Sequence, residues 1–130
     1  MARNYHVDIA AFAANVDRKW IDNLLSHFNV PGVESQRRGV ARRLSLDAIR
    51  TVVLVRALAA DTGLSVDRAL AAAAELLDAT DGRASATVPW ISLQIDRAAF
   101  DAEVGRRLAA AVEAVVPRKR GRPATRNPGK

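Results

Sequence analysis

The chain contains no cysteine, which excludes disulfides, thiolate metal sites and cysteine nucleophiles. Glycine and proline are also scarce, with seven and five residues among 130, and aromatic residues make up only 5% of the sequence. A composition that is 49% hydrophobic and rich in alanine favours packed helices over a sandwich of strands. We therefore predict a mainly α-helical protein with a single modest core.

Long apolar runs and catalytic motifs are absent as well. No stretch approaches the roughly 20 apolar residues that span a bilayer, and no signal-peptide pattern is found, so we expect no membrane partner. The sequence has no phosphate-binding loop, no HExxH motif and no Gly-x-Ser-x-Gly motif, and its two histidines, His6 and His27, fall in different elements. We expect neither an enzyme nor a bound cofactor or metal.

Acidic residues are missing from the last 14 positions. Residues 117–130 carry six basic side chains and no acidic one, so they account for the whole formal net charge of +6. Nine basic and five acidic residues fall in 1–58, against five basic and nine acidic residues in 59–116. Two basic regions therefore flank an acidic one, as expected when one face of a protein meets a polyanion.

Local signals predict two short helices and a hairpin in the first 45 residues. Asp8 and Asp17 can cap the two helices, and Asn15 between them accepts a left-handed backbone. One apolar stripe follows the second helix: Trp20, Ile21, Leu24, Leu25 and Phe28. Two segments within 33–44, joined through a polar loop with Gly39, predict a β-hairpin. Four arginines crowd its tip and its return strand: Arg37, Arg38, Arg42 and Arg43.

Three further helices are predicted downstream. Ser45 can cap one that ends at Gly63, with a stripe of Leu46, Ile49, Val53 and Ala57; Ser65 can cap the next, with a stripe of Val66, Ala69, Leu70, Ala73 and Leu77, and the two form a helical hairpin. Residues 83–89 are predicted as a loop, and the alternation over 90–95 predicts a short strand. Asp96 can cap a last helix to Val116, with a stripe of Phe100, Val104, Leu108, Ala111 and Val115. That stripe fits either the core or a dimer seam.

Two segments carry a family resemblance. The segment DIAAFAANVDRKWIDNLL (8–25) supplies helix, turn and helix, and GVARRLSLDAIRTVVLVRALAADTGLSVDRAL (39–70) supplies a hairpin strand and a helix pair. In this order the chain resembles the winged helix-turn-helix domain of the MerR family of transcription regulators, with ARRLS where that family usually has aromatic-Arg-x-Tyr-Ser. The resemblance implies a winged helix-turn-helix DNA-binding domain over 1–80, a dimerisation or partner-binding region over 81–116, and a homodimer formed by C-terminal helices.

The residue types support double-stranded DNA as the partner. A helix fits the major groove, and the exposed face of the second helix offers five side chains of types that can reach base edges or phosphates: Arg18, Lys19, Asp22, Asn23 and Ser26. We take Arg18, Lys19 and Asn23 as the DNA-binding candidates among them. The hairpin arginines would pair with phosphates, since four arginines within seven residues repel one another unless a partner neutralises them.

The basic end, 117–130, resembles an AT-hook, whose core is Arg-Gly-Arg-Pro. The matching residues are Arg118, Lys119, Arg120, Gly121, Arg122 and Pro123. We expect this segment to be disordered when free and to bind the narrow, electronegative minor groove of A·T-rich DNA. The alternative is a generic basic tail, which would also bind DNA through its charge.

Three functions remain open, and all place the protein in the cytoplasm at the nucleoid. The leading hypothesis is a repressor or autoregulator. The second is an antitoxin-type protein that binds DNA and neutralises a protein partner through its C-terminal half, with the edge of the strand near Trp90 adding to the partner's sheet. The third is an architectural or excision-type DNA binder. Candidate dimer or partner residues are Trp90, Ile91, Leu93, Phe100, Val104 and Leu108.

Overall fold

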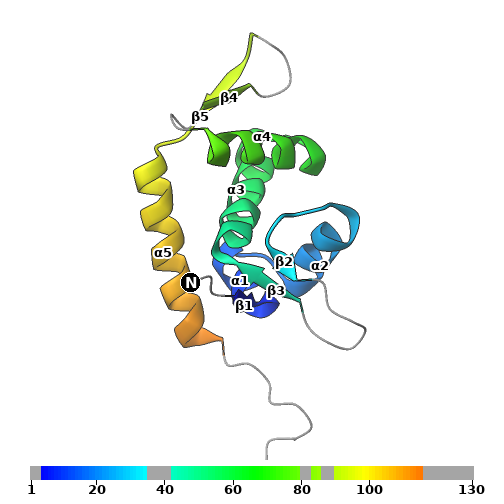
Figure 1. Cartoon of the computed structure of the whole chain (residues 1–130), viewed down its shortest axis with the longest axis vertical. Helices are drawn as coiled ribbons and strands as arrows, with labels where there is room; N and C mark the ends of the chain where they lie inside the picture. Colours follow the sequence, from blue (N-terminus) through cyan, green and yellow to red (C-terminus); the bar gives the residue numbers. More distant parts are fainter. Residues whose placement is uncertain (1–3, 35–41, 80–82, 86–89, 116–130) are drawn as a thin grey trace, which may run out of the picture.

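Helices dominate the described residues 4–34, 42–79, 83–85 and 90–115 of the computed structural model, as predicted (Figure 1). In chain order the elements are β1 (Asn4–His6), α1 (Val7–Ala14), α2 (Arg18–His27), β2 (Val33–Glu34), β3 (Arg43–Ser45), α3 (Leu46–Thr62), α4 (Val66–Asp78), β4 (Arg83–Ser85), β5 (Ser92–Gln94) and α5 (Arg97–Ala114). Within these ranges, no helix has both the length and the apolarity to cross a bilayer.

A small antiparallel sheet holds the start of the chain against the predicted hairpin. Its strand order is β1-β3-β2, and Leu44 of β3 is opposite Tyr5 on one side and Val33 on the other. Leu44 is fully buried, so the sheet covers part of the core. Gly32 lies before β2 with φ of 90°, and a Cβ there would collide with Oγ of Ser45. The close return of the hairpin therefore requires glycine at this position.

Most of the predicted helix boundaries are confirmed. Asn15 adopts the left-handed conformation with φ of 61°, and Gly63 ends α3 with φ of 76°. The side chains of Asp17, Ser45 and Asp96 accept from the backbone N–H three residues later, at 2.8, 3.2 and 3.0 Å. These caps are local interactions, which is why residue spacing was enough to predict them.

The predicted cap of α1 is wrong by two residues. Nδ1 of His6 accepts from the backbone N–H of Asp8 at 3.0 Å, so His6 is the cap and Asp8 lies in the first turn. His6 is also the last residue of β1, paired with Arg43 of β3. Strand pairing holds the chain extended up to His6, and the helix can begin only after it.

The central helix α3 is buried on more than one side. Val52 and Val53 belong to a core cluster shared with α1, α2 and α5, whereas Leu54, Val55 and Leu58 belong to a second cluster shared with α4. The single stripe predicted for α3 is therefore too narrow, and its Ala57 is only partly buried. A helix packed on two sides shows no single apolar face in its sequence.

Helix α4 lies across the end of α3 (Figure 1). Its buried residues are Ala69, Ala72, Ala73 and Leu76, whereas Leu77 of the predicted stripe is only partly buried. The contact face is thus rotated from the predicted one, because alanines occur all around this helix and leave its orientation to the shape of α3. Their small side chains allow close packing.

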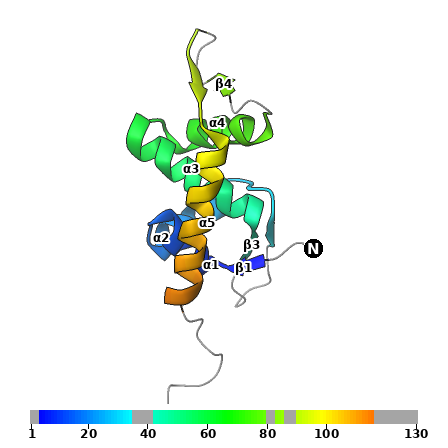
Figure 2. The ribbon, with the colours of Figure 1, turned by 90° about the vertical axis from the view of Figure 1, so that its left-hand side faces the viewer.

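Helix α5 runs alongside α1 and α3 (Figure 2). Val104 and Leu108 are 1% and 8% exposed and pack in the same cluster as the buried alanines of α1. Nη1 of Arg107 also donates to the carbonyl of Ala13 at 3.3 Å. The stripe of α5 is therefore core, and the dimer-seam alternative is wrong for Val104 and Leu108. Region 81–116 shares the core of the region before it.

A second, two-stranded sheet lies at the end of the molecule opposite α1, at the top of Figure 1. Residues 83–85 form β4 and pair with β5, so the loop predicted for 83–89 is wrong in its first three residues. The predicted alternation holds over 92–95, where Leu93 and Ile95 pack partly buried against the α3 and α4 cluster while Ser92 and Gln94 are exposed. It fails at Ile91, which is exposed and lies before β5. Pairing with a strand that begins at Ser92 could not be inferred from the short segment RAS alone.

Candidate nucleic-acid interface

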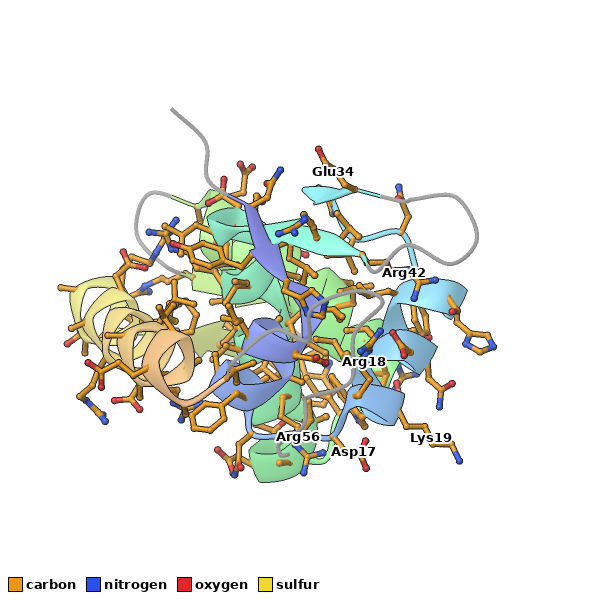
Figure 3. All side chains as sticks on the ribbon, turned by 90° about the horizontal axis from the view of Figure 1, so that it is seen from below. Asp17, Arg18, Lys19, Glu34, Arg42 and Arg56 are labelled. Carbon is orange, nitrogen blue, oxygen red and sulfur yellow. The ribbon has the colours of Figure 1, made fainter. Side chains whose placement is uncertain are left out.

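The polar side of α2 and the start of β3 form one surface, shown from below in Figure 3. Ile21 and Leu24 point into the core, and this orientation turns the opposite side of α2 outward. We define the α2 surface by the five predicted DNA-binding residues that the structure describes there: Arg18, Lys19, Asn23, Arg42 and Arg43. Four of them are exposed, and Arg42 is partly buried.

Arg42 joins the hairpin to α2. Its Nη1 lies 3.3 Å from Oδ1 of Asp22, and its Nη2 donates to Oγ of Ser26 at 3.3 Å. Both partners are on α2, one turn apart, so a single guanidinium spans the outward side of the helix. The chain just before β3 is thereby held next to the outward side of α2.

Arg18 forms a second set of ion pairs at the start of α2. Its Nη1 lies 2.9 Å from Oδ1 of Asp8, and its Nε lies 3.3 Å from Oδ2 of Asp22. Asp22 is therefore shared by Arg18 and Arg42. Sequence reasoning missed this role of Asp8 and Asp22. The spacing of four residues between Arg18 and Asp22 signalled one pair, but the pairing with Arg42 depends on the tertiary structure.

The other three residues of the α2 surface make fewer interactions. Between described residues, no side-chain hydrogen bond or ion pair is formed by Lys19, Asn23 or Arg43. Lys19 extends away from the body of the molecule (Figure 3). These are the groups on this surface that are most open to an external partner.

Two neighbouring arginines have roles within the protein. The guanidinium of Arg56 lies 5.8 Å from the ring centroid of Trp20, a cation–π contact between α3 and α2. Arg50 pairs with Asp47 at 2.8 Å and with Asp101 at 3.3 Å, linking α3 to α5. Their charge is used to hold helices together.

Several predicted site residues lie outside the described residues: Arg37, Arg38, Arg118, Lys119, Arg120, Gly121, Arg122 and Pro123. The structure describes the chain up to Val115, directly after α5. A groove of about 320 Å³ is lined by Phe12, Ala13 and Asn15 of the α1 region and by Arg106, Arg107 and Ala110 of α5. The end of α5 therefore lies next to α1 and the turn that leads into α2 (Figures 1 and 2).

The candidate dimer or partner residues differ in how exposed their side chains are. Trp90 lies in a turn before β5 rather than in the strand, and it is 80% exposed. Ile91 is also exposed, at 38%, whereas Leu93 and Phe100 are partly buried. Together with the buried Val104 and Leu108, this leaves Trp90 and Ile91 as the members that can meet a partner without rearrangement.

No metal-binding cluster of three or more His, Cys, Asp or Glu side chains occurs in the part of the chain that the structure describes. Comparison of the chain with protein-family models, with curated proteins and with solved structures finds no match. The geometry of the α2 surface and the charge distribution of the chain are therefore the observations from which a function can be proposed.

Proposed function

We propose that this protein is a double-stranded-DNA-binding transcriptional regulator, acting as a repressor or autoregulator, with a winged helix-turn-helix architecture. The observation that carries the proposal is the contact of Arg42 with Asp22 and Ser26. It joins an arginine-bearing hairpin to the exposed side of a helix that follows a tight turn. The helix has the dimensions to enter a DNA groove, and the hairpin beside it carries positive charge that can bind DNA phosphates.

Helix α2 is the element proposed to enter the major groove. That groove is about 12 Å wide and admits one helix. Lys19 and Asn23 lie one turn apart on its outward side, where lysine can reach guanine or phosphate and asparagine can pair with adenine. The positive end of the helix dipole lies near Arg18 and Lys19 and favours a phosphate there.

The hairpin and the basic end are proposed to hold the flanking DNA. Arg43 on β3 is exposed, and the sequence of the hairpin adds two more arginines, Arg37 and Arg38. Residues 117–130 follow α5 from a point next to α1, which suits an AT-hook-like segment entering an adjacent A·T-rich minor groove. Tethering raises the effective concentration of this second contact.

The regulator is proposed to act as a homodimer, because a single small domain gains specificity by pairing two half-sites. The stripe of α5 is not available for this contact, since its central residues are buried within one chain. Analytical ultracentrifugation of the free protein and of its DNA complex tests the dimer. A one-to-one complex with a protected region shorter than one helical turn contradicts it.

The DNA-binding experiment compares two duplexes at physiological salt by fluorescence anisotropy. One is the DNA upstream of the protein's own gene, narrowed by footprinting, and the other is a random sequence of equal length. A regulator binds the footprinted site about a thousandfold or more tightly than the random one. Equal affinities indicate an architectural DNA binder, and absence of binding in dilute buffer, where charge attraction is strongest, overturns the proposal.

A second candidate, antitoxin-type capture of a protein partner, is favoured by the exposure of Trp90 in the turn before β5. The two-stranded β4 and β5 sheet has outer edges to which a partner strand could add. Purification of the natively expressed protein tests this function. The antitoxin-type function is supported if a stoichiometric second protein co-purifies with the wild type and is lost in Trp90→Ala while DNA binding is unchanged. If no second protein co-purifies, only the transcriptional-regulator function is retained.

A further inference from the structure

The ion pairs of the α2 surface form one continuous chain that crosses three elements. Asp8 of α1 contacts Arg18, Arg18 contacts Asp22 of α2, and Asp22 contacts Arg42 beside β3, at 2.9, 3.3 and 3.3 Å. Two carboxylates therefore alternate with two of the five side chains proposed to meet DNA. An acidic residue in the middle of a proposed anion-binding surface requires a physical reason.

Asp22 is not the cap of its helix. The N-terminus of α2 is already capped by Asp17, which accepts from the N–H of Trp20 at 2.8 Å. Asp22 is in the second turn, partly exposed, and its side chain contacts Arg18 and Arg42. Ion pairs with this much exposure are weak, because water screens them and both side chains lose freedom. A phosphate can therefore displace the carboxylate from either arginine.

A displaced carboxylate does not leave the surface. When a phosphate takes the guanidinium of Arg18 or Arg42, Asp22 stays within a few ångströms of the new negative charge and repels it. Each contact of these arginines with the DNA backbone is thus weakened. A complex on random sequence relies on such contacts, whereas a complex in which Lys19 and Asn23 meet base edges can leave the two arginines paired with Asp22 and avoid the repulsion. Contacts made by Lys19 and Asn23 to base edges carry no comparable penalty.

We propose that Asp22, assisted by Asp8, is a specificity-determining residue: it competes with DNA phosphates for Arg18 and Arg42 and so suppresses binding to random sequence. This inference rests on the proposed DNA-binding function. Weak backbone contacts alone then fail to hold the protein on DNA, and a site that also satisfies the base-reading side chains is required. Repulsion of wrong partners is a general route to specificity.

The test uses the full chain and the variant Asp22→Asn, which keeps shape and removes charge. The matched control is Asp78→Asn, the same charge change at the end of α4 next to β4. Affinities for the footprinted and the random duplex are measured over a salt series. For Asp22→Asn we expect random DNA to bind about tenfold tighter, with a salt slope steeper by about one, and the footprinted site to gain about threefold or less. The control changes both affinities less than twofold.

The outcomes separate the two proposals. Unchanged or weaker binding by Asp22→Asn, or equal gains on both duplexes, overturns the role of Asp22 while leaving DNA binding intact. A wild-type chain that binds no duplex in dilute buffer overturns the proposed function and this inference with it. Asp8→Asn removes the other carboxylate from α1 and is expected to shift selectivity in the same direction by about threefold. It keeps the proposal testable if Asp22→Asn fails to fold, which circular dichroism reports.

Discussion

On the α2 surface, Arg18 and Arg42 pair with partly exposed carboxylates. On α5, Arg97 and Arg107 pair with carboxylates of their own helix and also donate to main-chain carbonyls of other helices. Arg97 reaches Leu77 at the end of α4, at 3.0 Å, and Arg107 reaches the end of α1, at 3.3 Å. A cation at a helix C-terminus satisfies an otherwise unpaired carbonyl and the helix dipole together. Arginine content alone therefore does not identify a binding surface in this protein, because the acceptor of each guanidinium decides its role.

The largest expected effect tests whether α5 belongs to the core. Leu108→Ala removes a buried side chain that packs on α1 and should lower the free energy of unfolding by about 3 kcal/mol, measured by urea denaturation. Val112→Ala on the exposed side of the same helix is the matched control, with a change below about 0.5 kcal/mol. If Leu108→Ala leaves the free energy of unfolding unchanged but lowers the oligomeric mass, α5 forms a dimer interface instead of belonging to the core.

Removal of residues 117–130 tests the basic end against the α2 surface. We expect a loss of about 30-fold in affinity for a duplex with A·T-rich flanks and a shallower salt dependence, with the footprinted site unchanged. A chain with the same 14 residues in scrambled order is the control. It should keep most of the salt-dependent affinity and lose the preference for A·T flanks. A shifted footprint after the deletion would contradict the tether.

Lys19→Ala and Arg107→Ala contrast the two surfaces directly. Loss of Lys19 should weaken DNA binding about tenfold and reduce the salt slope by about one, with stability unchanged. Loss of Arg107, which also pairs with Glu103 at 2.7 Å, should lower the free energy of unfolding by about 1 kcal/mol and leave DNA affinity within twofold. If Arg107→Ala weakens DNA binding as much as Lys19→Ala, the distinction drawn from guanidinium acceptors is wrong.

The smallest effect concerns a carboxylate held by a hydroxyl rather than by an arginine. Oγ of Ser65 donates to Asp67 at 2.6 Å, and this hydrogen bond lowers the pKa of Asp67 below its ordinary value. A lowered folded-state pKa stabilises the fold above the ordinary pKa, and that contribution is lost as the pH falls through the folded pKa. Ser65→Ala should therefore raise the pKa of Asp67, followed by NMR titration of its carboxyl carbon. An unchanged titration would exclude the hydrogen bond as the cause.

Predictions from the sequence were correct where the deciding interaction is local. Asp17, Ser45 and Asp96 cap helices through bonds that span three residues, and Asn15 turns the chain through its own backbone preference. The mainly helical class followed from composition, because helix propensity is also a local property of each residue. His6 replaced Asp8 as a cap only because β3, more than 30 residues later, extends the chain beside it.

The same distinction between local and long-range interactions applies to the candidate site. The sequence by itself determined that the net positive charge lies in 117–130, that α2 has one polar side and that arginines flank Gly39, because these are properties of order and composition. Only the tertiary structure decided that Asp22 lies between Arg18 and Arg42, that β4 pairs with β5 and that the centre of the α5 stripe is buried. Each of these depends on contacts between groups that are distant in sequence. The sequence pattern of an apolar stripe or of a charged residue does not reveal which distant group it will contact.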